Sequence, residues 1–212
     1  MQAAPGRTPS IDAFTETLPT MTLALTLQIL ATLAGLLYII FMIRENIICW
    51  PFGIIGSLLS VYLFLDARLY SESVLYVFYA VMGLWGWLRW HRREEQADNP
   101  VIRWALRAHL RSIAVAALLA MGLGFTTSAF TDAQRPLFDA TTTVFSFLAT
   151  YLEIAKVLET WIYWFLINLA TIWLYHDRDL DIYAVLIGIY SVLSVVGFVR
   201  WRQSYRAQSA TA

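Results

Sequence analysis

The sequence predicts an all-α membrane protein with seven transmembrane helices, and three observations predict it. The chain of 212 residues is 59% hydrophobic and only 14% charged, with a mean hydropathy of +0.59. A soluble domain carries roughly 25% charged residues, because its surface must face water. The charges also fall in short clusters between long apolar runs, and the chain contains an internal repeat. This composition excludes disordered chains, coiled coils, secreted disulfide scaffolds and nucleic-acid-binding proteins.

Each apolar run is long enough for a spanning helix, or nearly so when flanking aromatic and arginine side chains extend its ends. In chain order the runs are 17–43, 46–65, 73–88, 112–131, 136–155, 160–175 and 182–199. The fifth run contains two acids, Asp139 and Glu153. The fourth helix, expected over 109–130, follows the polar linker 89–111. The first run is too long for a cleaved signal peptide and has no basic region before it.

The basic residues predict how the helices are oriented in the membrane. With seven spans, eleven of the fifteen Lys and Arg residues fall on one face of the membrane and four on the other. The larger set is Arg44, Arg89, Arg92, Arg93, Arg103, Arg107, Arg111, Lys156, Arg200, Arg202 and Arg206. Because short cytoplasmic loops are enriched in Lys and Arg, we expect a cytoplasmic C-terminus and an N-terminus outside.

The internal repeat has an offset of 111 residues, and 45–90 aligns with 156–201 without gaps. The identical pairs include Trp50/Trp161, Asp66/Asp177, Gly86/Gly197, Arg89/Arg200 and Trp90/Trp201. Since a fourth helix lies between the two triplets, they run parallel in a 3+1+3 arrangement, which is a transporter design with substrate bound between the halves. A purely structural repeat is the alternative.

This arrangement divides the chain into five parts. They are a mobile N-terminal tail (1–19), the first three-helix repeat (20–90), the basic linker and fourth helix (91–131), the second repeat (132–201) and a cytoplasmic tail (202–212).

The sixth helix carries the first candidate binding residues, Trp161, Trp164 and Asn168. Their spacing of i, i+3 and i+7 places them on one helical face. An aromatic belt at the membrane interface is the alternative for the tryptophans. An amide in mid-span is costly towards lipid, so Asn168 should face the bundle, either for a ligand or for a helix-to-helix hydrogen bond.

The matching positions of the second helix are Trp50, Gly53 and Ser57. Small residues therefore face the bulky ones of the other repeat, and we hypothesise that Gly53 and Ser57 leave room for a flat ring resting on Trp164. Close helix packing through Gly53 and Gly56 is the alternative.

Two further helices contribute polar and aromatic faces. They carry Tyr76, Tyr79 and Gly83 on the third helix, and Ser146, Thr150 and Glu153 on the fifth. A carboxylate inside a span is a functional candidate, although Lys156 could form a local ion pair with Glu153. Aromatic faces with one carboxylate suit a flat cationic solute.

Several classes of function lack the residues that they need. No phosphate-binding G-x-x-x-x-G-K-[ST] motif occurs, and the three histidines are isolated in the sequence. These are His91, His109 and His176. We therefore expect no metal site, no cofactor and no catalytic residue, so the chain is not expected to be an enzyme. A non-transporting scaffold or receptor remains a competing class.

Four stretches of the chain match a known family: 46–56 with its W-P-F-G motif, 68–73, 83–87 and 159–168 with its W-x-x-W-x-x-x-N motif. Over 22–203 the sequence resembles the PnuC-type nicotinamide riboside transporters, which belong to a family of vitamin transporters with a SWEET-like fold. The resemblance implies a bacterial inner-membrane protein with the 3+1+3 fold that moves the riboside by facilitated diffusion. It also implies a homotrimer, and uptake coupled to a cytosolic kinase that phosphorylates the product. Trp161, Trp164 and Asn168 would line the site.

The sequence departs from this family at two positions. Tyr76 and Thr150 stand where glutamines are expected in nicotinamide riboside transporters. Tyrosine and threonine hydroxyls replace only part of the hydrogen bonding of an amide. Thiamine, another flat cation, is therefore the alternative substrate.

Overall fold

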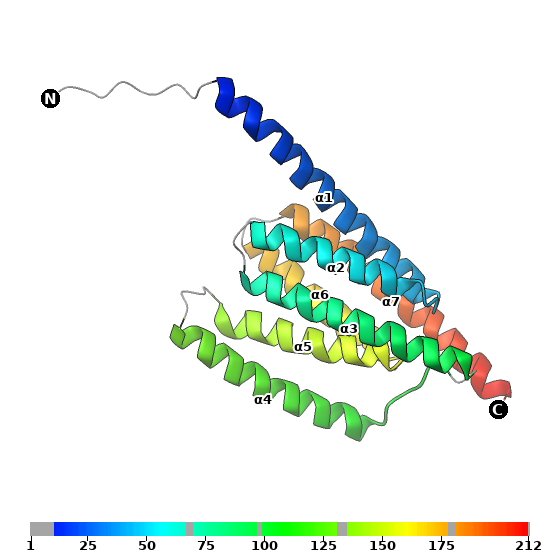
Figure 1. Cartoon of the computed structure of the whole chain (residues 1–212). Helices are drawn as coiled ribbons and strands as arrows, with labels where there is room; N and C mark the ends of the chain where they lie inside the picture. The colour runs from blue at the N-terminus through cyan, green and yellow to red at the C-terminus, as the bar shows by residue number, and fades with distance from the viewer. Residues whose placement is uncertain (1–10, 67–69, 97–98, 131–134, 178–180, 212) are drawn as a thin grey trace.

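The computed structural model describes residues 11–66, 70–96, 99–130, 135–177 and 181–211. These residues form seven α-helices (Figure 1). They are α1 (Ile11–Ile43), α2 (Cys49–Asp66), α3 (Tyr70–Glu95), α4 (Leu106–Phe130), α5 (Pro136–Ile154), α6 (Thr160–Asp177) and α7 (Asp181–Thr211). The described part of the chain contains no strand, only an isolated bridge between Ile102 and Val157. The all-α prediction with seven helices is confirmed. The expected tail of 1–19 overlaps α1, and residues 1–10 lie outside the described ones.

The surface of the helices is apolar, as a membrane protein requires. Four helical segments of the described chain are long and apolar enough to cross a bilayer: Thr22–Ile43, Cys49–Asp66, Leu106–Phe130 and Val185–Ala210. Thr160–Leu174 is apolar but shorter. Large apolar side chains such as Leu118 and Phe125 are exposed on the outside of α4, where water would disfavour them and lipid would not.

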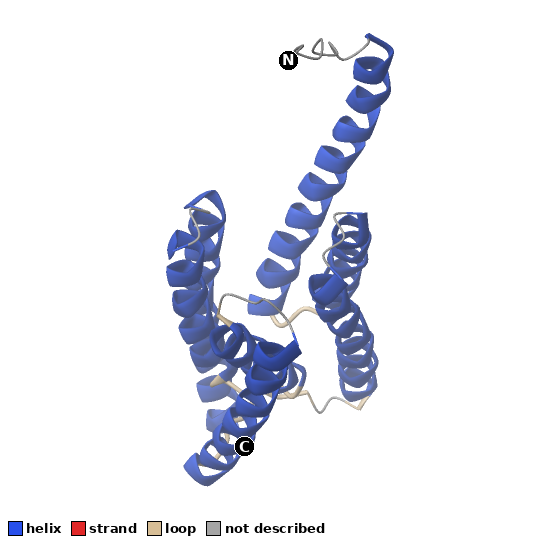
Figure 2. Cartoon of the chain, turned by 90° about the vertical axis from the view of Figure 1, so that its left-hand side faces the viewer, coloured by secondary structure: helices blue, strands red, loops and turns tan. Residues whose placement is uncertain are grey.

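Six helices pack into a closed ring. Neighbours along the chain pack side by side in two groups, α1–α2–α3 and α5–α6–α7, and the ring closes where α1 meets α7 and α3 meets α5. The helix α4 lies outside the ring and packs mainly on α5, with Ala116, Ala120 and Gly124 buried, while its first turn reaches α6, where the His109 ring meets the Tyr163 hydroxyl at 3.0 Å. The first part of α1 extends away from the other helices, as Figures 1 and 2 show.

One end of the bundle, which we call the basic end, contains the ends of α1, α3, α5 and α7 and the starts of α2, α4 and α6. The loops after α1 and α5 have the same backbone shape at this end. Glu45 and Lys156 have positive φ angles of 56° and 53°. The Glu45 N–H donates to Met42 O (2.9 Å), and the Lys156 N–H donates to Glu153 O (3.0 Å). All four positions fit the offset of 111 residues.

The linker between α3 and α4 is attached to the loop between α5 and α6. Ile102 exchanges backbone hydrogen bonds with this loop, donating to Lys156 O (3.0 Å) and accepting from Leu158 N (2.8 Å). The Arg103 guanidinium donates to Glu159 at 2.7 Å, and this contact raises the pKa of Arg103. The linker is therefore part of the basic end rather than a free connection.

Four tryptophans form a continuous buried cluster at the basic end, which we call the four-tryptophan cluster. Trp50 packs edge-on against Trp90 with ring centroids 5.3 Å apart, and Trp161 packs edge-on against Trp201 at the same distance. Trp90 and Trp201 contact each other at 6.5 Å. All four side chains are at most 1% exposed. The repeat pairs Trp50/Trp161 and Trp90/Trp201 thus make matching contacts.

Glycine is required where two of these rings approach a helix. The faces of Trp50 and Trp161 lie against Gly86 and Gly197. A Cβ atom added at Gly197 would lie 2.5 Å from Cε3 of Trp161. The identity of these glycines in the two repeats therefore has a packing reason.

We predict that Gly197→Ala destabilises the folded protein by about 1–3 kcal/mol, the usual cost of overpacking. Gly188→Ala on the same helix is the matched control, because a Cβ there has no neighbour within 4 Å. Thermal unfolding in detergent, followed by circular dichroism, measures both. Equal melting temperatures for the two variants would contradict the packing role of Gly197.

Candidate functional site

A buried carboxylate, Glu153 of α5, lies among side chains from four other helices. It is 3% exposed, and one of its oxygens accepts a hydrogen bond from the Tyr38 hydroxyl of α1 at 2.9 Å. Cys49 of α2 and Tyr79 of α3 lie close enough to interact with it electrostatically. The indole of Trp164 on α6 is also close to it. Because a buried carboxylate is costly unless it is paired, this convergence marks the centre of a polar site.

Trp164 has a donor that no protein group satisfies. Its indole Nε1 is buried and makes no hydrogen bond of good geometry, although it is near the Glu153 carboxylate. The ring as a whole is only half-buried. A buried donor without a partner costs about 1–3 kcal/mol. Trp164 therefore offers both a ring face and an N–H to a ligand.

Asn168, one turn further along α6, is buried and directed at α7. Its side-chain nitrogen contacts Ser194 Oγ at 3.4 Å, while the Ser194 hydroxyl donates to Tyr190 O. Only 9% of Asn168 is exposed, so the amide faces the interior of the bundle. This contact with Ser194 involves the amide nitrogen. It does not involve the amide oxygen, which is the atom that can accept a hydrogen bond from a hydroxyl group.

The third helix presents an aromatic face. Tyr76 stacks on Phe64 with centroids 5.2 Å apart and meets Tyr79 edge-on at 5.8 Å. The Tyr79 hydroxyl faces Ser146 of α5. The Thr150 hydroxyl donates to Ser146 O of its own helix at 2.8 Å, which commits its proton. Thr150 is thus available to a ligand only as an acceptor.

The predicted residues of the second helix are placed differently from our hypothesis. The space beside Gly53 is occupied by the Tyr38 ring, since a Cβ there would lie 2.7 Å from Tyr38 Cδ2. Ser57 is buried. Trp50 and Trp161 are 1% exposed and belong to the four-tryptophan cluster. A flat ligand would therefore contact Tyr38 rather than Gly53.

The local ion pair between Glu153 and Lys156, which was the alternative to a functional role for Glu153, is not formed. Lys156 pairs with Glu45 at 3.2 Å, because α5 ends at Ile154 and Lys156 adopts a left-handed backbone conformation. Glu153 instead bonds to Tyr38. The two buried charges have separate partners.

Sequence reasoning missed Tyr38, Cys49 and Ser194 as members of this site. Tyr38 is a single aromatic residue within a long apolar run, and only the contact between α1 and α5 shows that its hydroxyl meets Glu153. Ser194 was hidden in the repeat, because its equivalent, Gly83, has no side chain.

A multi-pass helical bundle with polar and aromatic side chains inside a helical ring is a layout found in membrane transport proteins. The family model described as nicotinamide mononucleotide transporter matches residues 25–203. The chain therefore belongs to this family of membrane transporters and is not an enzyme.

Known relatives and a solved structure agree with this assignment. The nicotinamide riboside transporter PnuC of Escherichia coli (strain K12) is 24% identical over 212 residues, covering 88% of this chain and 89% of the relative. The protein of the same name from Shigella flexneri gives the same values. The crystal structure of the vitamin B3 transporter PnuC superposes with a TM-score of 0.71 and 22% identity, covering 85% of this chain and 82% of that one. The resemblance to PnuC-type transporters is confirmed.

We predict that the Tyr38 hydroxyl and the Glu153 carboxylate are energetically coupled. A hydrogen bond to a charged group is worth about 1.5–3 kcal/mol, so Tyr38→Phe and Glu153→Leu, which each remove one partner of the bond, should show a coupling above ~1 kcal/mol in a double-mutant cycle. Unfolding free energies in detergent measure it. The control combines Glu153→Leu with Tyr62→Phe, since Tyr62 is an exposed tyrosine of α2. Additive effects in the Tyr38 cycle would contradict the bond.

Proposed function

We propose that this chain takes up nicotinamide riboside by facilitated diffusion and binds it beside Glu153. The observation that carries the proposal is the buried carboxylate faced by aromatic side chains from neighbouring helices. Nicotinamide riboside has a flat, positively charged pyridinium ring and a sugar with hydroxyl groups. A carboxylate and aromatic faces are the protein groups that attract such a ring. The names of the relatives support this substrate.

Each part of the site has a role in this proposal. The pyridinium ring stacks on Trp164, because Trp161 is packed between Gly197 and Trp201 and has no free face. Glu153, held by Tyr38, balances the positive charge. Asn168 accepts a hydrogen bond from the ribose through its amide oxygen.

The third helix closes the site opposite Trp164. Tyr76 and Tyr79 are the residues in this role, and Thr150 contributes an acceptor at the floor of the site. Ser57 of α2 is buried and is a further candidate for a sugar contact. Trp50 and Gly53 act indirectly, because they hold the Tyr38 ring.

The helices then form a 3+1+3 arrangement of two parallel repeats, with α4 as the connecting helix. The matching tryptophan contacts and loop shapes at the basic end support this arrangement. So does the closure of the ring by two equivalent contacts, α1 with α7 and α3 with α5. The proposed boundaries are 20–90 for the first repeat, 91–131 for the linker and α4, and 132–201 for the second. The flanking segments 1–19 and 202–212 include the start of α1 and the end of α7.

The basic end faces the cytoplasm of a bacterial inner membrane, and the N-terminus lies outside. The eleven Lys and Arg residues at this end support the orientation. Net uptake without an energy source requires that the product be removed, and a cytosolic kinase that phosphorylates the riboside would trap it as an anion. Assembly as a homotrimer rests on the resemblance, and cross-linking in native membranes tests it.

Direct binding tests the proposed function. Titration of the purified protein with nicotinamide riboside should quench tryptophan fluorescence, because a cationic ring stacks on Trp164. Thiamine and riboflavin are the comparison ligands. A response to thiamine alone would transfer the substrate assignment to thiamine, and a response to none of the three would contradict a vitamin site.

We predict that Trp164→Leu weakens riboside binding by about 10- to 100-fold, since stacking and cation–π contacts in a desolvated site are worth ~2 kcal/mol. Trp173→Leu is the matched control on the same helix, because Trp173 is 48% exposed and packs on Phe138. Isothermal titration calorimetry measures both variants. Equal losses in the two variants would remove Trp164 from the site.

We predict that Glu153→Gln reduces selection for positive charge. The amide keeps an acceptor for Tyr38, so folding is retained, while affinity for the cationic riboside falls about tenfold or more, ~1.4 kcal/mol. Affinity for the uncharged dihydronicotinamide riboside should change much less. Asp139→Asn, at the other end of α5, is the control. If both ligands lose affinity equally, Glu153 does not recognise charge.

A further inference from the structure

The only lysine of the chain, Lys156, forms a buried ion pair with Glu45 at the basic end. The ammonium nitrogen lies 3.2 Å from Glu45 Oε2, and the two side chains are only 5% and 17% exposed. The partners occupy equivalent positions of the two repeats, 111 residues apart, and both have positive φ. Equivalent positions thus carry opposite charges and meet each other.

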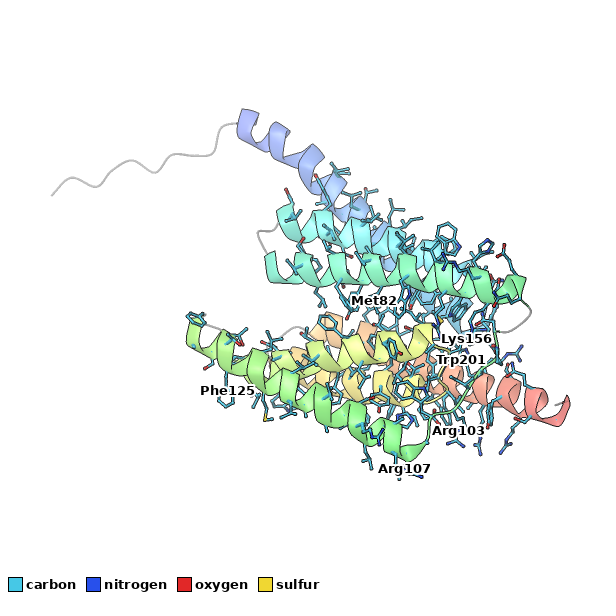
Figure 3. The ribbon with its side chains drawn as sticks, turned by 60° about the horizontal axis from the view of Figure 1, so that its bottom comes forward. Met82, Arg103, Arg107, Phe125, Lys156 and Trp201 are labelled. Carbon is cyan, nitrogen blue, oxygen red and sulfur yellow. The ribbon has the colours of Figure 1, made fainter. Side chains whose placement is uncertain are left out.

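The ion pair joins the two helix groups together with other contacts at the same end. Lys156 also donates to Asn99 O at 3.1 Å, and its charge lies 4.4 Å from the centre of the Trp90 ring. The indole N–H of Trp90 donates to Ile154 O (3.0 Å), and that of Trp201 donates to Met42 O (3.1 Å). Each of these two bonds runs from one helix group to the other. Figure 3 labels Lys156 and Trp201 at this end of the bundle.

A buried ion pair is a poor choice for a permanently closed interface. Two apolar side chains of similar size often stabilise such an interface equally well or better, because charges lose their hydration on burial. The two charges have an advantage only if the interface opens, since water then hydrates both of them and offsets the lost attraction. A pair with two low-energy arrangements is what a conformational transition needs.

We propose that Glu45 and Lys156 form the latch of a gate at the basic end. The latch is closed in this structure, and it separates when the two helix groups part to release substrate at that end. The Trp90 and Trp201 bonds across the interface open in the same step. This inference rests on the proposed transport function, but its test requires no substrate.

Cys49 provides a reporter for the gate. It is the only cysteine of the chain, lies on the first turn of α2 next to Trp50, and is completely buried. It belongs to the same core cluster as Trp90, Trp161 and Trp201. Parting of the helix groups at the basic end would therefore expose its thiol to solvent.

The experiment measures the rate at which a maleimide labels Cys49 in the purified full-length protein. Lys156→Gln and Glu45→Gln should each raise this rate at least about tenfold, because an unpaired charge shifts the equilibrium towards the open, hydrated state. The exchanged variant, Glu45→Lys with Lys156→Glu, should restore most of the protection. Arg103→Gln is the matched control, since it breaks an ion pair at the same end that does not cross between the helix groups.

Three results would overturn the latch. The first is wild-type labelling in single variants that elute as folded protein, and the second is an equal increase in Arg103→Gln. The third is loss of folding in both single variants and the exchanged variant, which would make the pair a structural element. Riboside uptake, measured separately, distinguishes failure of the latch from failure of the proposed function. If the labelling rates follow the prediction but the protein takes up no riboside, the gate is retained and the proposed substrate is rejected.

Discussion

The structure depends on the crosswise bonding of two tryptophans between the helix groups. Trp90 of α3 donates to the last turn of α5, and Trp201 of α7 donates to the last turn of α1. The final carbonyl groups of a helix have no partner within it. The Trp90 indole N–H supplies one for Ile154 O, and the Trp201 indole N–H adds a second donor at Met42 O, which also accepts the Glu45 N–H. The same indole rings carry the edge-on contacts with Trp50 and Trp161. Tryptophan side chains thus join the two helix groups, donate hydrogen bonds to the last turns of two helices and fill the core between them.

This constraint explains why the polar site lies where it does. The tryptophan bonds hold the last turns of α1 and α5 against opposite groups, which brings Tyr38 and Glu153 within 2.9 Å of each other. They also hold the loops that follow, where Glu45 meets Lys156. The hydrogen bonds described between the groups gather in this short stretch. Separation of the groups at the basic end would break them together, which gives the transition a cooperative character.

The sequence predicts those features that depend on local pattern or on the repeat. Helix number follows from the apolar runs, and the pairing of Trp50 with Trp161 and of Gly86 with Gly197 follows from the offset of 111. Which residues meet across the ring does not follow, because such contacts depend on tertiary packing. The role of Tyr38 is the clearest case, since nothing in its own helix indicates a carboxylate 115 residues away. For the same reason, the sequence did not predict that the Tyr38 ring fills the space beside Gly53.

The separate partners of the two buried charges have a consequence for binding. Had Glu153 paired with Lys156 three residues on, its charge would be neutralised and a cationic ligand would gain little from it. A tyrosine hydroxyl satisfies one acceptor position of the carboxylate and leaves the negative charge in place. The left-handed turn at Lys156 carries the lysine away to Glu45, so the charge that attracts a ligand and the charge pair that joins the helix groups stay independent. The short backbone turn between Glu153 and Lys156 therefore separates the carboxylate that attracts a ligand from the ion pair that joins the two helix groups.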